Sequence, residues 1–389
     1  MAAHLVGGTV RDRLLRRRPR DLDVAVEGDA IAFARAWGRE RGVDVDAAPA
    51  FGTATARAGS GSRAVRVDFS STRGERYRRP GALPEVFPAG IEEDLRRRDF
   101  TINAMAIPLT GPSRGDLVDP HGGREDLRRG VIRLLHSRSP HDDPTRAFRA
   151  LRFALRFDFR IAADTRRWID EARSAGAFSA VSGDRLRREL RLLFSEQSPA
   201  LAVPALARLG LDRAIDPALA ASAAVRRRLR RLGETRRRVP EDVRFGAALL
   251  AWGLDLAPAT GRRVADRLGL AGDLRRAFLR VGEDLASIRA RLRSSAGDSG
   301  VAAFARGLSE AEALALESAL SEREAARFRR AARKAARIRL AIRGEDLRRS
   351  GMDAGPAIGR ALDRTWRARV DGRIRRSDEL AFALREEER

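Results

Sequence analysis

The sequence predicts an α+β fold in which a small β-sheet comes first and helices form the rest of the chain. Within the first hundred residues, short apolar runs alternate with turns, as in half-buried strands. After about Pro140 this pattern disappears, and apolar residues recur at helical spacing, as at Leu186, Leu190 and Leu193. With 389 residues, the chain is long enough for roughly two to four packed units.

The predicted sheet has five short strands and one helix packed against it. The helix covers residues 30–39, where Ile31, Ala34 and Trp37 recur at helical spacing. Glycines and prolines interrupt residues 72–90, so we expect an extended connection there without regular structure. The strands are expected at residues 4–6, 22–26, 43–45, 53–57 and 64–69.

Basic residues dominate the charge of the chain. The formal net charge is +24, the pI is about 11.6, and Lys334 is the only lysine. Such a surface attracts phosphate backbones, and a guanidinium group can bind two phosphate oxygens at once. A polyanion is therefore the expected partner, although a general enrichment in arginine would raise the pI in the same way. Arginine clusters occur in the helical half at residues 226–231, 236–238 and 329–339.

The composition excludes several kinds of site. The chain has no cysteine, which rules out disulfides, thiolate zinc sites and cysteine nucleophiles. No basic segment followed by an apolar one occurs at the N-terminus, and no apolar run is long enough to cross a membrane. We therefore expect a cytoplasmic protein without a membrane partner.

Two glycines mark a candidate phosphate-binding turn. Gly7 and Gly8 follow the first predicted strand, and a short helix containing Arg11 comes next. Without side chains, the backbone N–H groups of such a turn can approach a phosphate closely, with Arg11 as a counter-charge. A glycine pair alone is more typical of a tight turn, so the interpretation depends on its neighbours.

A pair of aspartates near the glycine turn forms a candidate metal site. Asp21 and Asp23 lie two residues apart at the start of a strand, which places both carboxylates on one face. Two such oxygen ligands suit Mg²⁺, which also bridges to substrate phosphates. Asp68, at the end of another predicted strand, is a candidate third metal ligand. A metal held here next to a phosphate turn would serve the attack of a hydroxyl on a nucleotide, with pyrophosphate as the leaving group.

Several segments give the chain a resemblance to a known family. The segments GGTVRDRLL with DLDVAV, then RRRDFTINAMA, then DDPTRAFRALRFALRFDF resemble class II tRNA nucleotidyltransferases and bacterial poly(A) polymerases. The resemblance covers residues 4 to about 195, and RGEDLRRSGMDAGPAIGRALD resembles the tail of the tRNA branch. It implies a polymerase-β-like nucleotidyltransferase head with a mixed sheet at residues 1–136, then a helical neck at 137–198, a helical body at 199–342 and a helical tail at 343–389.

The resemblance also implies roles for individual residues. Asp21 and Asp23 match the catalytic carboxylates that bind the metal ion. The residues that match nucleotide-binding positions, or complete the motifs in which these positions lie, are Gly8, Arg11, Arg98, Asp99 and Asn103.

The segment DDPTRAFRALRFALRFDF begins a predicted helix with polar residues. Asp143 precedes Pro144, an arrangement typical of a helix N-cap. Asp143, Arg146, Arg149 and Arg152 recur every three residues, so a pocket for a phosphate or a base is the alternative. A carboxylate beside a guanidinium complements the exocyclic amine and ring acceptor that cytosine and adenine share. The resemblance assigns Asp143 and Arg146 to this selection of CTP and ATP.

Two further features receive a structural interpretation. Arg185 and Glu189 lie one helical turn apart, and we expect them to pair with each other. Some relatives carry a metal-dependent phosphohydrolase domain, which would need histidines in the helical body. No such domain is expected, because none of the four histidines lies in the predicted helical body. They are His4, His121, His136 and His141.

The expected activity is the template-independent addition of CCA to the 3′ end of tRNA, with CTP, ATP and Mg²⁺. We prefer complete CCA addition because a loop in the region of residues 72–90 supports the switch from C to A in the family that the chain resembles. Enzymes that add only CC or only A, and poly(A) polymerases, are alternatives within the same class. An RNA-binding protein without activity is the alternative from another class. The arginine clusters would suit the acceptor and T arms of tRNA.

Overall fold

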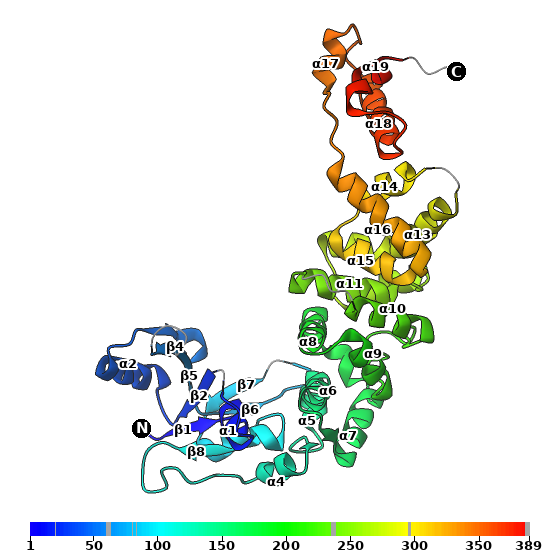
Figure 1. The fold of residues 1–389 in the computed structure, drawn as a ribbon. Helices are drawn as coiled ribbons and strands as arrows, with labels where there is room; N and C mark the ends of the chain where they lie inside the picture. Colours follow the sequence, from blue (N-terminus) through cyan, green and yellow to red (C-terminus); the bar gives the residue numbers. More distant parts are fainter. Residues whose placement is uncertain are drawn as a thin grey trace. The chain divides into compact units, whose positions relative to one another are not determined.

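Six strands form one mixed sheet near the start of the chain (Figure 1). In this computed structural model the strand order is β3-β4-β5-β2-β1-β8, with β2 parallel to β5 and the other neighbours antiparallel. The structure describes residues 1–19, 21–59, 64–79, 81–82, 84–234, 239–294 and 297–385. The strand bounds are β1 Ala3–Val6, β2 Asp21–Val26, β3 Val45–Ala48, β4 Thr53–Ala58, β5 Val65–Ser71 and β8 Ala106–Pro108.

All five predicted strands overlap observed ones, but the strand expected at 43–45 shares only Val45 with β3, which lies further along the chain. Helix α2, Ala30–Arg41, ends at Gly42, which adopts the left-handed conformation. The backbone N–H of Val43 still donates to the carbonyl of Gly38 at 2.9 Å, so the helix end holds Val43 back from the sheet. Strand pairing therefore starts at Val45. Strand β8 is absent from the prediction.

Helix α2 covers one face of the sheet, as predicted. The side chain of Asp29 accepts the N–H groups of Ile31 and Ala32 and starts the helix. Alternate strand residues such as Val24, Val26 and Phe69 pack under the helix in one apolar core. Figure 1 shows α2 beside β4 and β5.

The opposite face of the sheet carries the paired aspartates. Ala25 is buried against Leu95 of α3, Ile91–Arg96, in a separate cluster. Because side chains alternate along a strand, Asp21 and Asp23 share the face of Ala25. The apolar positions of β2 thus dictate that both carboxylates lie away from α2.

Residues 73–88 contain a β-hairpin, which contradicts the predicted irregular connection. Strand β6, Arg73–Arg76, pairs antiparallel with β7, Glu85–Pro88. Gly74 lies opposite Phe87, and a Cβ atom on Gly74 would collide with the Phe87 ring. The glycine that indicated a chain break instead makes room for an aromatic ring across the strand pair. Residues 80 and 83 of this segment lie outside the described residues.

The first of two compact units comprises Met1–Gln197 and Ala205–Ile215. A short parallel pair of β9, Val131–Ile132, and β10, Arg160–Ile161, shows that strands do not end at Pro140 as predicted. After β8, the described residues of this unit are otherwise mainly helical. The remaining α-helices assigned wholly to this unit are α1 Gly8–Leu14, α4 Gly123–Arg128, α5 Ser139–Asp142, α6 Thr145–Phe157, α7 Ala163–Ser174 and α8 Gly183–Glu196.

The second unit comprises Ser198–Pro204 and Asp216–Arg389, and its described residues contain helices and no strand. Helix α9, Pro199–Arg208, contributes residues to both units. The predicted division into head, neck, body and tail is finer than these two units and stays a prediction. The further helices are α10 Ala223–Gly233, α11 Glu241–Gly253, α12 Pro258–Arg267, α13 Gly272–Arg293, α14 Ser299–Arg306, α15 Glu310–Ala319, α16 Glu322–Arg337, α17 Gly344–Arg349, α18 Pro356–Val370 and α19 Glu379–Leu384.

The only lysine connects three segments of the second unit. Nζ of Lys334, on α16, donates to Oδ2 of Asp298 at 3.0 Å and to the carbonyl of Val370 at 3.3 Å. Asp298 precedes α14, and Val370 ends α18. This ammonium group therefore helps to hold α14, α16 and α18 together.

Candidate active site

Gly7 and Gly8 form the turn between β1 and α1. Gly7 has a φ angle of +62°, and a Cβ atom on it would lie 2.8 Å from Nη1 of Arg98. A Cβ atom on Gly8 would lie 3.3 Å from Nη2 of Arg11. Both positions lie within 3.8 Å of Oδ2 of Asp23. A side chain on Gly7 would strain the backbone and displace Arg98, and one on Gly8 would crowd Arg11, so glycines suit the place where two guanidinium groups and a carboxylate approach the backbone.

Thr9 fixes strand β2 beside this turn. Its Oγ1 accepts the N–H of Asp23 at 2.7 Å, and its hydroxyl donates to the carbonyl of Asp21 at 3.3 Å. Thr9 is almost completely buried. The sequence gives no sign of this contact, because a single threonine in a short helix forms no pattern.

The charge around Asp23 fits a cation. Burial raises the pKa of the Asp23 carboxyl; Arg98 and Arg11 oppose this rise, while the carboxylates of Asp68 and Asp21 add to it. Asp21 is exposed at the start of the same strand, and Asp23 is half-buried. A divalent cation beside this pair would stabilise the ionised carboxylates against burial and mutual repulsion.

Asp68 lies beside Asp23 in the parallel strand pair, but its side chain has protein partners. Oδ1 of Asp68 accepts hydrogen bonds from Oγ1 of Thr55 at 2.6 Å and from Nε of Arg66 at 2.9 Å. No group of three or more His, Cys, Asp or Glu side chains among the described residues has a geometry that would hold a metal ion. The role of Asp68 as a third ligand stays a prediction.

A chain of hydrogen bonds joins the glycine turn to helix α6. Nη1 of Arg11 donates to Oδ1 of Asn103 at 2.7 Å, and Nδ2 of Asn103 donates to Oδ1 of Asp99 at 3.0 Å. Oδ2 of Asp99 accepts from Nη2 of Arg149 at 2.5 Å. Burial lowers the pKa of Arg11, whose guanidinium also stacks on the ring of Phe157 at 4.8 Å. Arg11 is therefore held in one orientation beside the turn.

Arg98, which follows helix α3, supplies the second guanidinium at the turn, and Asp94 of α3 binds it. Asp94 is buried and accepts from Nη2 of Arg97 at 2.6 Å and from Nη2 of Arg98 at 2.7 Å. Burial alone would raise the pKa of Asp94, but the charges and hydrogen bonds of Arg98 and Arg97 lower it overall. The ionised Asp94 thus holds Arg98 against the glycine turn.

Asp143 lies one residue earlier than a helix N-cap would. The N-cap position of α6 is Pro144, while Oδ1 of Asp143 accepts the N–H of Thr145 at 3.0 Å and its hydroxyl at 2.6 Å. Nη1 of Arg146 donates to Oγ of Ser139 at 2.7 Å, and Nη2 of Arg146 donates to the carbonyl of Arg97 at 2.8 Å. The predicted capping interaction is present in this shifted form.

These elements enclose a cavity of about 760 Å³ in the first unit, a size that accommodates a small-molecule ligand. Asp21, Asp68 and Arg152 are not part of its lining, and Arg152 donates instead to Oε1 of Glu196 at 2.6 Å. The other predicted site residues do line it, namely Gly7, Gly8, Arg11, Asp23, Arg98, Asp99, Asn103, Asp143, Arg146 and Arg149.

The expected pairing of Arg185 with Glu189 is wrong. Nη2 of Arg185 donates to Oδ1 of Asp143 at 2.7 Å, and the carboxylate of Glu189 lies 3.9 Å from Nε of Arg152. Helical spacing indicated only which residues were close along α8, whereas the partners come from α6 and the residues just before it. Sequence patterns also missed other lining residues, among them Ser70, Glu75, Tyr77, Phe153, Arg156 and Arg188.

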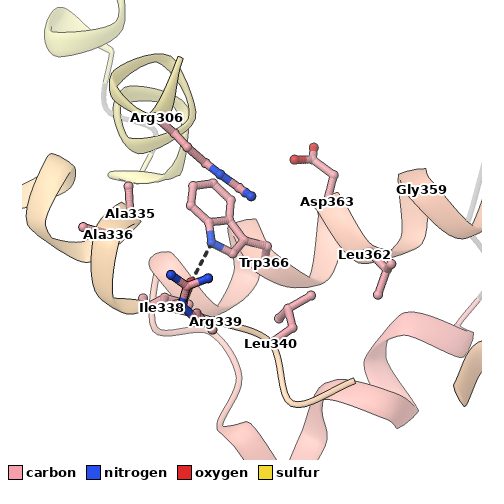
Figure 2. Close-up of a pocket in the computed structure, with 10 residues that line it drawn as sticks. All are labelled: Arg306, Ala335, Ala336, Ile338, Arg339, Leu340, Gly359, Leu362, Asp363 and Trp366. Atoms are coloured by element: carbon pink, nitrogen blue, oxygen red, sulfur yellow. Dashed lines mark hydrogen bonds between the residues drawn. The ribbon is translucent and has the colours of Figure 1, made fainter. Parts of the chain in front are cut away.

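A second cavity, of about 620 Å³, lies among α14, α16 and α18 of the second unit. Figure 2 shows the indole of Trp366 at its centre, donating from Nε1 to the carbonyl of Ile338 at 3.2 Å. The guanidinium of Arg306 stacks over the same indole at 5.4 Å. None of the predicted catalytic, metal-binding or nucleotide-binding residues lines this cavity, although Arg339 of the predicted arginine cluster does.

Comparisons with known proteins extend over the whole chain. Residues 3–133 match the family model of the poly A polymerase head domain. The chain is 31% identical to a CC-adding tRNA nucleotidyltransferase of Deinococcus radiodurans over 98% of the chain and 88% of that protein. It is 33% identical to an A-adding tRNA nucleotidyltransferase of Geobacter sulfurreducens over 99% of the chain. The chain spans less than half the length of that relative and of two further A-adding enzymes.

A solved structure is similar over nearly the same extent. The Thermotoga maritima CCA-adding enzyme complexed with tRNA has 30% sequence identity and a TM-score of 0.79, with 98% of this chain and 90% of that chain covered. No described helix is long and apolar enough to span a membrane. From the match to the head domain and the similarity across the full sequence, the chain belongs to the class II tRNA nucleotidyltransferase family.

Proposed function

We propose that this chain is a CCA-adding enzyme that transfers CMP and AMP from CTP and ATP to the 3′ end of tRNA. In each step the tRNA 3′-hydroxyl attacks the α-phosphate, a new phosphodiester bond forms, and pyrophosphate leaves. One observation carries the proposal: a single cavity is lined by the glycine turn, Asp23 and the polar residues that open α6.

Members of the nucleotidyltransferase family generally use a divalent metal ion. We propose that Mg²⁺ is this ion and that Asp21 and Asp23 hold it. When bound, it would lower the pKa of the attacking hydroxyl and neutralise charge on the leaving pyrophosphate. The raised pKa of Asp23, caused by burial and neighbouring carboxylates, supports this assignment because a cation would favour the ionised form.

The residues at the turn would bind the triphosphate. Gly7 and Gly8 leave the backbone accessible, with Arg98 close to Gly7 and Arg11 close to Gly8. Arg11 is held by Asn103 and Arg98 by Asp94, so neither needs to be ordered when the nucleotide binds. This preorganisation would align the α-phosphate with the tRNA hydroxyl.

Asp143 and Arg146 would select the base. Arg146 uses two of its five N–H groups for Ser139 and Arg97, which leaves further donors for a ring acceptor. Asp143 accepts from the protein through Oδ1, and Oδ2 can accept the exocyclic amine of cytosine or adenine. Arg149 lines the cavity while it is bound to Asp99. Arg152 does not line the cavity, and it would act on the site indirectly, through its hydrogen bond to Glu196.

The arginines of the second unit would bind the acceptor and T arms of tRNA. Several of them are engaged, since Arg228 pairs with Asp255 and Arg329 pairs with Glu317. Arg227, Arg230 and Arg333 are exposed on α10 and α16 and would contact phosphates. Residues 236–238, the remaining predicted cluster, lie outside the described residues. A tRNA-modifying activity of this kind would place the protein in the cytoplasm.

Extension assays on three tRNA transcripts test the proposal. The transcripts end before CCA, after CC and after the complete CCA, and each is incubated with the chain, Mg²⁺ and CTP, ATP or both. We expect only the missing nucleotides to be added, after which extension stops. Addition of CC alone, an activity named for the D. radiodurans relative, or of A alone would identify a specialist. Long A tails would indicate a poly(A) polymerase, and no extension would contradict nucleotidyl transfer.

A further inference from the structure

We propose that Arg185 is a positioning residue that orients the carboxylate of Asp143 and thereby sets the base selectivity of the cavity. The proposal rests on the assignment of this cavity to a nucleotide. Arg185 lies on α8, and Asp143 lies just before α6. Their contact links α8 to the segment that precedes α6, across 42 residues of sequence.

Three donors converge on one oxygen of Asp143. Oδ1 accepts the N–H of Thr145 at 3.0 Å, the hydroxyl of Thr145 at 2.6 Å and Nη2 of Arg185 at 2.7 Å. A carboxylate oxygen has two lone pairs, so three donors occupy its accepting capacity. No residue in the described part of the chain donates to Oδ2. The contacts therefore divide the carboxylate into one oxygen for the protein and one for a ligand.

Backbone contacts hold the guanidinium of Arg185 in place. Its Nη1 donates to the carbonyl of Gly81 at 2.9 Å. The N–H of Gly81 in turn donates to the carbonyl of Asp142 at 3.1 Å. Gly81 has a φ angle of +71°, and a Cβ atom on it would lie 2.8 Å from Cβ of Ala180. Gly81 is thus packed tightly against Ala180, and it offers its carbonyl to Arg185 from a fixed position.

The planar guanidinium is suited to this double contact. One nitrogen binds Gly81 and the other binds Asp143, so fixing the first contact also fixes the second. A lysine has a single ammonium nitrogen and cannot reproduce both contacts in this geometry. Thr145 alone would hold Oδ1 but would leave the carboxylate free to tilt about that oxygen. Loss of Arg185 should therefore weaken the hydrogen bond from Oδ2 to the exocyclic amine of the base.

Equilibrium binding of four nucleotides tests the proposal without depending on transfer. CTP, ATP, UTP and GTP are titrated separately into the full chain and into R185Q, R185K, D143A and the D143A/R185Q double variant. The matched control is R187Q, because Arg187 lies on the same helix, pairs with Asp184 at 2.5 Å and does not line the cavity. Thermal unfolding of each variant shows whether a change in affinity reflects a loss of folded protein.

We expect R185Q to bind CTP and ATP about tenfold more weakly, with little change for UTP and GTP, and R185K to restore less than half of the lost discrimination. R187Q should bind all four nucleotides like the unaltered chain. In the D143A background R185Q should have no further effect, because Arg185 acts through Asp143.

Different results would overturn separate claims. If R185Q lowers the affinity for all four nucleotides equally, or lowers it further in D143A, then Arg185 does not act by orienting Asp143. If the unaltered chain binds the four nucleotides equally, the positioning role is also wrong. If the chain selects CTP and ATP through Arg185 but does not extend tRNA, the role of Arg185 holds and the proposed transfer fails.

Discussion

Nη1 of Arg98 lies 2.8 Å from the point where a Cβ atom would stand on Gly7. Substitution of Gly7 by alanine should therefore push the guanidinium away and also strain the backbone, which has a φ angle of +62°. We expect G7A to bind CTP and ATP at least about tenfold more weakly, measured by titration. The folded state should lose about 1 kcal/mol of stability from the backbone strain.

Gly42 provides the matched control for this substitution. It has the same φ angle of +62°, but nothing lies within 4 Å of its Cβ position. G42A should lose a similar amount of stability and keep its nucleotide affinity. Equal affinities of G7A and G42A would show that the contact between Gly7 and Arg98 has no part in binding.

The buried carboxylate of Asp94 should matter more for stability than its exposed neighbour. D94N removes the carboxylate that pairs with Arg98 and one of the two that pair with Arg97, and we expect it to lower the free energy of unfolding by about 3 kcal/mol. E93Q removes the exposed pair with Arg96 on the same helix, and its effect should stay below about 1 kcal/mol. Denaturant unfolding of both variants measures the difference, and similar losses would argue against a buried ion pair at Asp94.

The same carboxylate predicts a loss of stability in acid. The net effect of burial, Arg98 and Arg97 lowers the pKa of Asp94 below its ordinary value of 3.8. The stabilisation is therefore complete above the unfolded pKa and is lost as the pH falls through the lower, folded pKa. We expect the difference in unfolding free energy between the unaltered chain and D94N to shrink below about pH 4. A difference that stays constant down to pH 2 would contradict the lowered pKa.

Asp21 and Asp23 should be required for transfer but not for folding. D21N and D23N should each reduce the rate of tRNA extension by about a thousandfold or more, since a metal ion contributes several kcal/mol to the stabilisation of the transition state. Asp46, exposed on β3 of the same sheet, supplies the control variant D46N, which should extend tRNA normally. Full activity of D21N or D23N in single-turnover assays would disprove the metal assignment.

Local patterns predicted the strands of the sheet that carry Asp21 and Asp23, because alternation along β2 determines which side chains share a face. The hairpin of β6 and β7 was missed, since the role of Gly74 depends on Phe87, which lies thirteen residues away in the sequence. Arg185 was assigned the wrong partner for a similar reason. Helical spacing relates residues within one helix, whereas the contacts of Arg185 with Asp143 and Gly81 depend on how α8 packs against the rest of the unit.

The contact of Lys334 with Asp298 and Val370 makes this lysine a site at which chemical labelling can report on the structure. Apart from the α-amino group, its ammonium is the only amine in the sequence, so amine-reactive dyes applied at high pH label a single side chain. That side chain lies where α14, α16 and α18 meet. The reactivity of Lys334 therefore reports whether α18 is docked, and an increase in labelling rate when tRNA is added would register a release of this contact, whereas tRNA that covers Lys334 would lower the rate.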